Sequence, residues 1–276
     1  MERLLFGTAG SPLSSRSPST EAGIERVGEL GLGCMEVQFV QGVKMGERSA
    51  RGVGGVASRE GVMLSAHGPY FINLNAREPE KVMASKERII QTARVSSLFG
   101  AISIVFHAAF YLEDPPDEVY LKVKRNLEEV MRGLREEGNR VWVRPEVTGK
   151  ATQFGTLEEV LSLSSEVEGI APCIDFAHLH ARTGRFNSYE EFVSILEEVK
   201  RVLGRGALEN MHIHVSGIEY TRAGERKHLP LRESNFQYIE LLRALKDYGV
   251  KGFLICESPN KEEDSLLLKE TFDSLS

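Results

Sequence analysis

Cysteine is scarce in this sequence, with Cys34, Cys173 and Cys256 as the three among 276 residues. They form no CxxC pair and no disulfide framework, so a disulfide-stabilised secreted domain is excluded and a reducing, cytoplasmic setting is expected. No apolar run reaches about 18 residues, which argues against a membrane span. The opening residues MERLLFGTAGSPLSS carry an acid and no long apolar stretch, so they do not resemble a signal peptide.

A basic excess is also missing, because the formal net charge is −6. The overall field therefore does not indicate nucleic-acid binding, although a local basic rim around a cleft binds phosphate whatever the total charge. The content of 41% hydrophobic and 27% charged residues is typical of a soluble globular protein with a large core. The length fits one large α/β barrel or two small domains.

The first apolar run is followed by FGTAGSPLS, which lacks the G-x-G-x-x-G fingerprint of an open dinucleotide-binding sheet. Eight apolar runs rich in β-branched residues predict strands at 3–7, 34–40, 62–66, 101–106, 140–145, 170–175, 210–215 and 252–257. Amphipathic segments predict helices at 19–30, 47–60, 80–100, 117–138, 156–167, 189–204, 235–249 and 262–275. This alternation predicts a single (β/α)8 TIM barrel, an α/β fold spanning residues 1–276 as one domain.

Residues of the types that bind metals lie on or directly after six consecutive predicted strands. They are His67, His107, Glu146, Asp175, His212 and Glu257. The carboxyl ends of barrel strands all open onto one face, so these side chains are expected to converge there. Imidazole and carboxylate ligands together suit Zn²⁺ or Mn²⁺, and the sequence therefore predicts a metal site at this face.

Structural explanations remain open for single members of this set. Glu146 could pair with Arg144, and Asp175 could be the N-cap of a helix. In NMHIHV, His212 and His214 share one face of the strand, so either could be the ligand. His178 and His180 pose the same question, and the D-x-x-H spacing from Asp175 favours His178.

Six short motifs occur in an order and spacing that resemble the endonuclease IV family of abasic-site endonucleases (AP endonuclease family 2). They are HGPYFINL, FHAA, PEVTGK, CIDFAHLHA, MHIHVSG and ICES. The family consists of zinc enzymes on a xylose-isomerase-like TIM barrel. The resemblance implies a monomer that acts on double-stranded DNA with abasic sites, and it implies that Tyr70 is a DNA-binding residue that opens the duplex at the damaged nucleotide.

The resemblance also implies which residues hold two or three zinc ions. His67 and His107 would bind one ion, and the catalytic Glu146 would bridge it to a second ion bound by Asp175, His212 and Glu257. A third ion would take His178 and His228. The family adds an aspartate there from a D-x-H motif, but this chain reads GERKHLPL, with Arg226 at that position and Glu225 one residue away. Either Glu225 substitutes for the aspartate after a small backbone shift, or the third ion is weakly bound or absent.

Two other functions remain open. A sugar isomerase or epimerase on the same barrel would use a single Mn²⁺ or Mg²⁺ held by Glu146, Asp175, His212 and Glu257. The discriminating residues are the additional histidines His67, His107, His178 and His228, which only a multi-metal site requires. A barrel that binds metal or a partner without turnover is the third possibility.

Overall fold

The strands form because short apolar runs are buried on both faces, as parallel strands inside a ring of helices must be. The computed structural model describes residues 1–275. Its parallel strands are β1 Leu4–Ala9, β2 Cys34–Gln38, β3 Met63–His67, β4 Ser103–Phe106, β5 Trp142–Pro145, β6 Ile174–Asp175, β7 Met211–Val215 and β10 Gly252–Cys256. They pair in the order β5-β4-β3-β2-β1-β10-β7-β6. Parallel bridges from Val143 to Ile170 and from Glu146 to Cys173 join β5 to the segment that leads into β6 and close the barrel.

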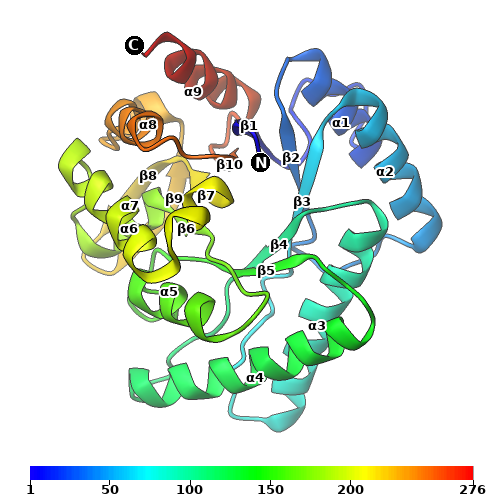
Figure 1. Cartoon of the computed structure of the whole chain (residues 1–276), viewed down its shortest axis with the longest axis vertical. Coiled ribbons are helices and arrows are strands. Elements are labelled where there is room, and N and C mark those ends of the chain that lie inside the picture. The colour runs from blue at the N-terminus through cyan, green and yellow to red at the C-terminus, as the bar shows by residue number, and fades with distance from the viewer. Residues whose placement is uncertain (276) are drawn as a thin grey trace.

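The helices surround the strands (Figure 1), and the predicted TIM-barrel fold is confirmed. They are α1 Thr20–Glu29, α2 Glu47–Glu60, α3 Pro79–Leu98, α4 Pro116–Glu136, α5 Leu157–Glu166, α7 Tyr189–Leu203, α8 Tyr238–Asp247 and α9 Glu262–Ser274, with short 3-10 turns η1 Arg205–Glu209 and η2 Leu231–Glu233. Helix α5 starts with a capping box between Thr156 and Glu159. Within residues 1–275, none of the helices combines the length and the apolarity needed to cross a bilayer.

The segment 170–175 is strand only at its end, since β6 holds just Ile174 and Asp175. The Asp175 carboxylate accepts a hydrogen bond from the backbone N–H of His178 at 2.7 Å. Asp175 is thus the N-cap of helix α6 (Phe176–Thr183), which the sequence analysis did not predict. The same residue therefore ends a strand and starts a helix.

An antiparallel hairpin of β8 (Gly217–Thr221) and β9 (Gly224–Leu229) follows β7 and was also not predicted. It contacts the loop after β5 through a bridge between Lys150 and Gly224. Gly224 has φ +98°, and a Cβ there would lie 2.2 Å from the carbonyl oxygen of Gly149. Only glycine fits this contact, which fixes the hairpin over the carboxyl end of β5.

Strand β5 also carries a buried arginine, Arg144. Arg144 donates to the backbone carbonyls of Pro172 at 2.8 Å and Asn210 at 3.0 Å. Burial lowers the pKa of its guanidinium to about 10, which still leaves it charged at neutral pH. Its hydrogen bonds go to these carbonyls and not to Glu146, so Glu146 is free for other contacts.

The loop after β1 is fixed by a carboxylate on the last helix. Glu262 accepts hydrogen bonds from the backbone N–H groups of Leu13 and Ser14, each at 2.8 Å. We expect E262Q to lower the free energy of unfolding by about 1–3 kcal/mol, because an amide cannot accept both bonds as a charged group does. Urea unfolding at neutral pH measures this loss.

The loss is expected to depend on pH. Burial raises the pKa of Glu262, but the N–H groups of Glu262, Leu13 and Ser14 outweigh it and lower the pKa below the usual value. The carboxylate therefore stabilises the fold above its unfolded-state pKa, and this contribution disappears as the pH falls through the lower folded-state pKa. The difference in the free energy of unfolding between wild type and E262Q should become smaller below about pH 4.3. A gap that stays constant down to about pH 3 would contradict this account.

Candidate metal centre

The carboxyl ends of the strands surround a cavity of about 450 Å³. Five of the expected ligands lie at this end: His67 ends β3, His107 follows β4, Glu146 follows β5, Asp175 ends β6, and Glu257 follows β10. His67, His107, Glu146 and Glu257 line the cavity directly, together with Tyr70, Lys150 and Gln153. Barrel closure thus brings together residues that are up to 190 positions apart in the sequence.

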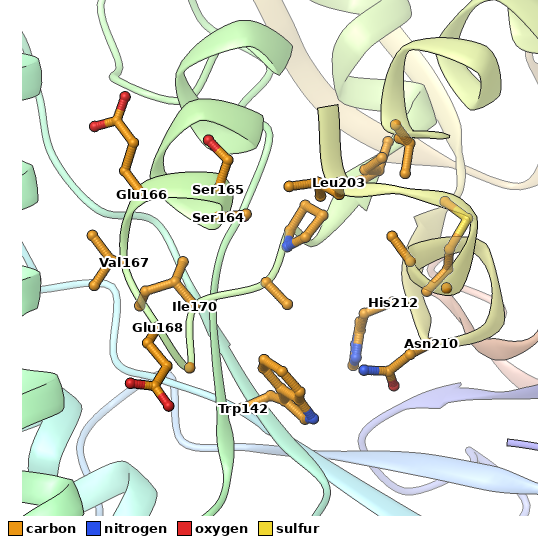
Figure 2. Close-up of a pocket in the computed structure, with 18 residues that line it drawn as sticks. Trp142, Ser164, Ser165, Glu166, Val167, Glu168, Ile170, Leu203, Asn210 and His212 are labelled. Carbon is orange, nitrogen blue, oxygen red and sulfur yellow. The ribbon is translucent and has the colours of Figure 1, made fainter. Parts of the chain in front are cut away.

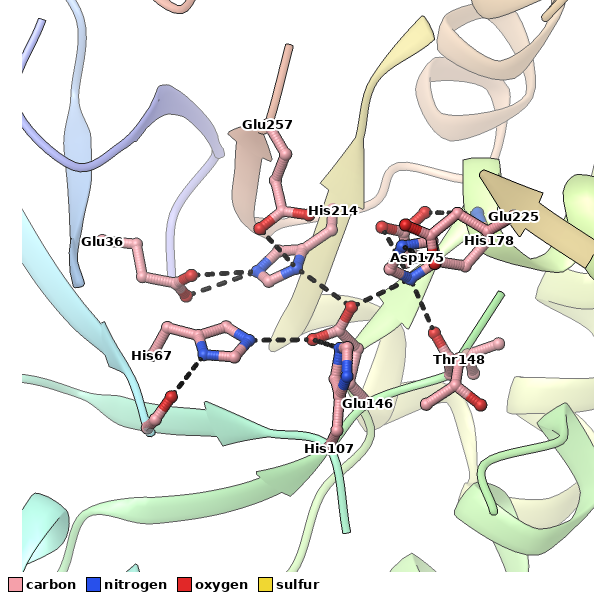
Figure 3. A network of polar contacts seen from close by, with 12 residues as sticks. Glu36, His67, His107, Glu146, Thr148, Asp175, His178, His214, Glu225 and Glu257 are labelled. Atoms are coloured by element: carbon pink, nitrogen blue, oxygen red, sulfur yellow. Dashed lines mark hydrogen bonds and ion pairs between the residues drawn. The ribbon is translucent and has the colours of Figure 1, made fainter. Parts of the chain in front are cut away.

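Glu146 lies at the centre of the cluster, as Figure 3 shows. Its Oε2 atom is 3.2 Å from Nε2 of His67 and 3.3 Å from Nε2 of His107. Its Oε1 atom is 3.1 Å from Nδ1 of His178 and 3.6 Å from Nδ1 of His214. One buried carboxylate therefore faces histidines on two sides, which is the arrangement a bridging ligand requires.

The histidine beside Glu146 on β7 is His214. Its Nδ1 atom is also 3.5 Å from Oε1 of Glu257. Glu146, Asp175, His214 and Glu257 place their ligand atoms within 4.8 Å of one another. The strand register explains this, because Asp175 pairs with His214, so both lie at the same height in the barrel.

His212, the expected ligand, lies two residues nearer the start of β7 and outside this group. Its Nε2 is 3.0 Å from Glu36 and its Nδ1 is 3.0 Å from the hydroxyl of Ser103. Burial lowers the pKa of His212 to about 4, so the ring is neutral. We therefore replace His212 by His214 in the predicted ligand set.

Figure 2 shows His212 at the wall of a different cavity, near the amino ends of the strands. This cavity has a volume of about 580 Å³ and is lined by residues such as Trp142 and Asn210. Cys173 lies beside His212 and His214, but burial raises the pKa of its thiol, so it is protonated and a poor metal ligand.

A third group, further along the rim, consists of Asp175, His178, His228 and Glu257. The Nε2 atoms of His178 and His228 are 3.2 Å apart. Glu225 completes this group, with carboxylate oxygens 3.5 Å from His178 Nε2 and 3.7 Å from His228 Nε2. The third group thus has an acid from the hairpin.

Glu225 reaches this position because β9 contains a bulge. Lys227 pairs with Glu219 and Glu225 pairs with Tyr220, so Arg226 is an extra residue in β9. An extra residue reverses the alternation of side chains, which lets Glu225 and His228 face the same side although they are three positions apart. Arg226 instead contacts Glu219 at 2.6 Å, away from the cluster.

The chemistry of the cluster fits a divalent cation. Three buried atoms that face it, Oε1 of Glu146, Oδ2 of Asp175 and Nδ1 of His214, have no hydrogen-bond partner. Buried acceptors without a donor are costly, and a cation among them removes that cost. Nitrogen and carboxylate ligands of this kind suit zinc and also manganese.

Without a bound cation, protons on the histidines balance part of the negative charge of the carboxylates. Burial lowers the pKa of His67, but contact with Glu146 outweighs it and raises the pKa to about 9. Burial likewise lowers the pKa of His178, while the charge of Asp175 raises it to about 10. The carboxylates therefore attract positive charge strongly.

The family of the chain follows from a match over most of its length. The family model described as the xylose isomerase-like TIM barrel matches residues 24–276. The chain belongs to this family. Within the xylose isomerase-like barrels, an uncharacterized protein of Methanocaldococcus jannaschii is 46% identical over 273 residues, which cover 99% of this chain and 98% of that protein.

A probable endonuclease 4 of Geobacillus sp. (strain WCH70) is 27% identical over 158 residues, covering 55% of this chain and 51% of that protein. This match supports the resemblance to endonuclease IV seen in the motifs, over about half of each chain.

Two solved structures of the same barrel superpose over nearly the whole chain. A D-tagatose 3-epimerase-like protein has a TM-score of 0.73 at 17% identity and covers 99% of this chain and 96% of its own. Endonuclease IV from Thermus thermophilus has a TM-score of 0.69 at 21% identity and covers 97% of this chain and 98% of its own. At such identities these likenesses show the fold alone.

Proposed function

We propose that this xylose isomerase-like barrel is a metal-dependent phosphodiesterase that cuts DNA at abasic sites, as the endonuclease IV resemblance implies. The observation that carries the proposal is a set of three adjoining ligand groups. They are His67, His107 and Glu146; the central group Glu146, Asp175, His214 and Glu257; and Asp175, His178, His228 and Glu257. The central group shares Glu146 with the first group and shares Asp175 and Glu257 with the third. A single ion needs only the central group. The flanking pairs, His67 with His107 and His178 with His228, supply ligands for further ions on both sides.

Two or three zinc ions are the cofactors that these nitrogen and oxygen ligands fit best. When bound, they supply Lewis acidity that polarises a phosphoryl oxygen and lowers the pKa of water. Glu146 would hold two of them, with one carboxylate oxygen toward His67 and His107 and the other toward His178 and His214.

Other residues at the cavity would bind and orient the DNA. Tyr70 is 60% exposed, and its ring centre is 6.0 Å from that of His67. An exposed aromatic ring beside the ligands would stack on a nucleotide that has left the helix. Lys150 lines the same cavity and would place a positive charge near a phosphate of the DNA. This charge is local, because the protein as a whole is acidic.

A sugar isomerase or epimerase with a single Mn²⁺ or Mg²⁺ is the second candidate. Glu146, Asp175, His214 and Glu257 form a four-ligand group by themselves, which favours it. Glu146 and Glu257 would then move protons on a ketose held at the ion. The cavity of about 450 Å³ accommodates a monosaccharide.

The deciding experiment measures both reactions on the same preparation. Purified protein is loaded with zinc or manganese, its metal content is determined, and it is mixed with a duplex that holds a single abasic site or with a ketose. Incision next to the abasic site with two or more ions per chain supports the proposal. Ketose turnover with one ion per chain, and no incision, supports the second candidate.

The hairpin acid gives a separate prediction. We expect E225A to weaken the third ion's binding about 10–100-fold and thereby lower the number of zinc ions retained after dialysis, because Glu225 is the acid from β9 that faces His178 and His228. R226A is the matched control, since Arg226 lies next to Glu225 but contacts Glu219. Zinc content is measured by elemental analysis. Equal zinc content in E225A and R226A would exclude Glu225 as a ligand.

A further inference from the structure

Glu36 in β2 is a buried carboxylate that belongs to none of the three ligand groups. Its oxygens accept hydrogen bonds from Ser65 Oγ at 3.1 Å and from Gln38 Nε2 at 3.2 Å. They also lie 3.0 Å from Nε2 of His212 and 3.3 Å from Nε2 of His214. A fully buried carboxylate with this many donors is held in a single orientation.

The donors around Glu36 define its role. Its oxygens accept hydrogen bonds from the Ser65 hydroxyl and the Gln38 amide, so the carboxylate acts as an acceptor here. The Nε2 atoms of His212 and His214 face the same carboxylate, and each of them must therefore supply the proton of its hydrogen bond.

Three of the other clustered histidines show why this proton matters. Nδ1 of His67 is bound by the backbone carbonyl of Gly68 at 2.8 Å, that of His178 by Val147 at 3.2 Å, and that of His228 by Glu257 at 3.2 Å. Because carbonyls only accept, each Nδ1 carries a proton and leaves the Nε2 lone pair free for a metal.

His214 is oriented the other way round. Its Nδ1 atom faces Glu146 and Glu257, and no backbone carbonyl binds its Nε2 atom among the described residues. Figure 3 shows the Glu36 carboxylate directed at the far side of the His214 ring, away from Glu146.

We propose that Glu36 is a positioning residue that keeps the proton of His214 on Nε2, so that Nδ1 offers its lone pair to the metal shared with Glu146, Asp175 and Glu257. The inference rests on the proposed metal centre but not on DNA as the substrate. Glu36 does for His214 what backbone carbonyls do for His67, His178 and His228.

This role also explains the second histidine on β7. The Ser103 hydroxyl lies 3.0 Å from Nδ1 of His212 and can donate to it, which leaves Nε2 to donate to Glu36. His212 thereby holds the carboxylate against His214. The pair His212 and His214 thus consists of a support and a ligand, in that order along the strand.

The test compares E36Q with E262Q, another exchange of a buried glutamate for glutamine in the same barrel. Zinc affinity is measured by competition with a chromogenic chelator. We expect E36Q to bind the zinc held by His214 about 10–100-fold more weakly than wild type, because the loss of a carboxylate that supports a ligand histidine has an effect of this size. E262Q should bind zinc as tightly as wild type. S65A, which removes one donor to Glu36, should shift the affinity less and in the same direction, and serves if E36Q does not fold.

A second readout reports the proton directly. In zinc-loaded protein labelled with ¹⁵N-histidine, two-bond ¹H–¹⁵N spectra should show His214 with its proton on Nε2. E36Q should add a form with the proton on Nδ1. Unchanged affinity and an unchanged spectrum in E36Q and S65A would overturn the inference.

The outcomes separate this inference from the proposed function. Zinc binding without incision of abasic DNA would reject the nuclease but leave the role of Glu36 intact if E36Q binds zinc weakly. Incision by wild type with equal zinc affinity in E36Q would reject Glu36 alone. A wild-type chain that binds neither zinc nor manganese would overturn both.

Discussion

The variant E146Q is expected to cut abasic-site DNA about 1,000-fold more slowly than wild type, or slower still. An amide in place of the carboxylate loses the charge that faces His67 and His107 through one oxygen and His178 and His214 through the other. Metal ions contribute several kcal/mol of transition-state stabilisation to such reactions, and ions that are held more weakly contribute less. Each 1.36 kcal/mol lost from this stabilisation slows the reaction tenfold. Single-turnover incision assays at saturating zinc measure the effect.

The fold should survive this change, because Arg144 does not depend on Glu146 for its hydrogen bonds. Circular dichroism and thermal unfolding of the chelator-treated proteins provide that control. E262Q changes a glutamate that binds the loop after β1 and does not line the cavity, so this variant should incise at the wild-type rate. Incision by E146Q within threefold of wild type, at equal zinc content, would show that the carboxylate does not bridge.

The second large effect concerns metal removal. A chelator should lower the melting temperature by roughly 10 °C relative to protein in excess zinc. Binding at a free concentration of about 1,000 times Kd stabilises by about 4 kcal/mol, and each kcal/mol moves the transition of a chain near this size by about 2–4 °C. The buried acceptors of Glu146, Asp175 and His214 then lose the cation between them. Differential scanning calorimetry measures the shift.

Re-adding zinc should restore the melting temperature, while Mg²⁺, which prefers oxygen ligands in octahedral geometry, should not. E146Q should respond to the chelator less than wild type does, because it binds less metal. A chelator effect equal in both proteins would place the stabilising ion elsewhere in the chain.

The barrel could be predicted because its strands are short apolar runs of regular spacing. Even 47–60, with three glycines, forms α2, since Ala50, Val53 and Ala57 still make a buried face. Most of the cluster followed from the same spacing, because a residue at the end of a parallel strand lies at the common rim whatever its distance in sequence.

The depth of a residue within the barrel could not be predicted. His212 and His214 point the same way, and only the pairing of Asp175 with His214 shows which lies level with the rim. Glu225 could be named only as a possible substitute for the family's aspartate, because the bulge at Arg226 that turns it toward His228 depends on hairpin pairing. Glu36 did leave a signal: a lone acid inside the run CMEVQFV must be buried, and a buried carboxylate needs partners.

The hairpin that carries Glu225 and His228 is an appendage to the eight-stranded wall. It contacts that wall's β5 loop through Gly149 and Gly224, where neither position admits a side chain. A methyl group at Gly224 would therefore displace Glu225 and His228 while leaving the eight parallel strands intact. In the proposed three-ion centre, one substitution at this glycine would remove the third site and keep the central group on the barrel, so the two could evolve independently.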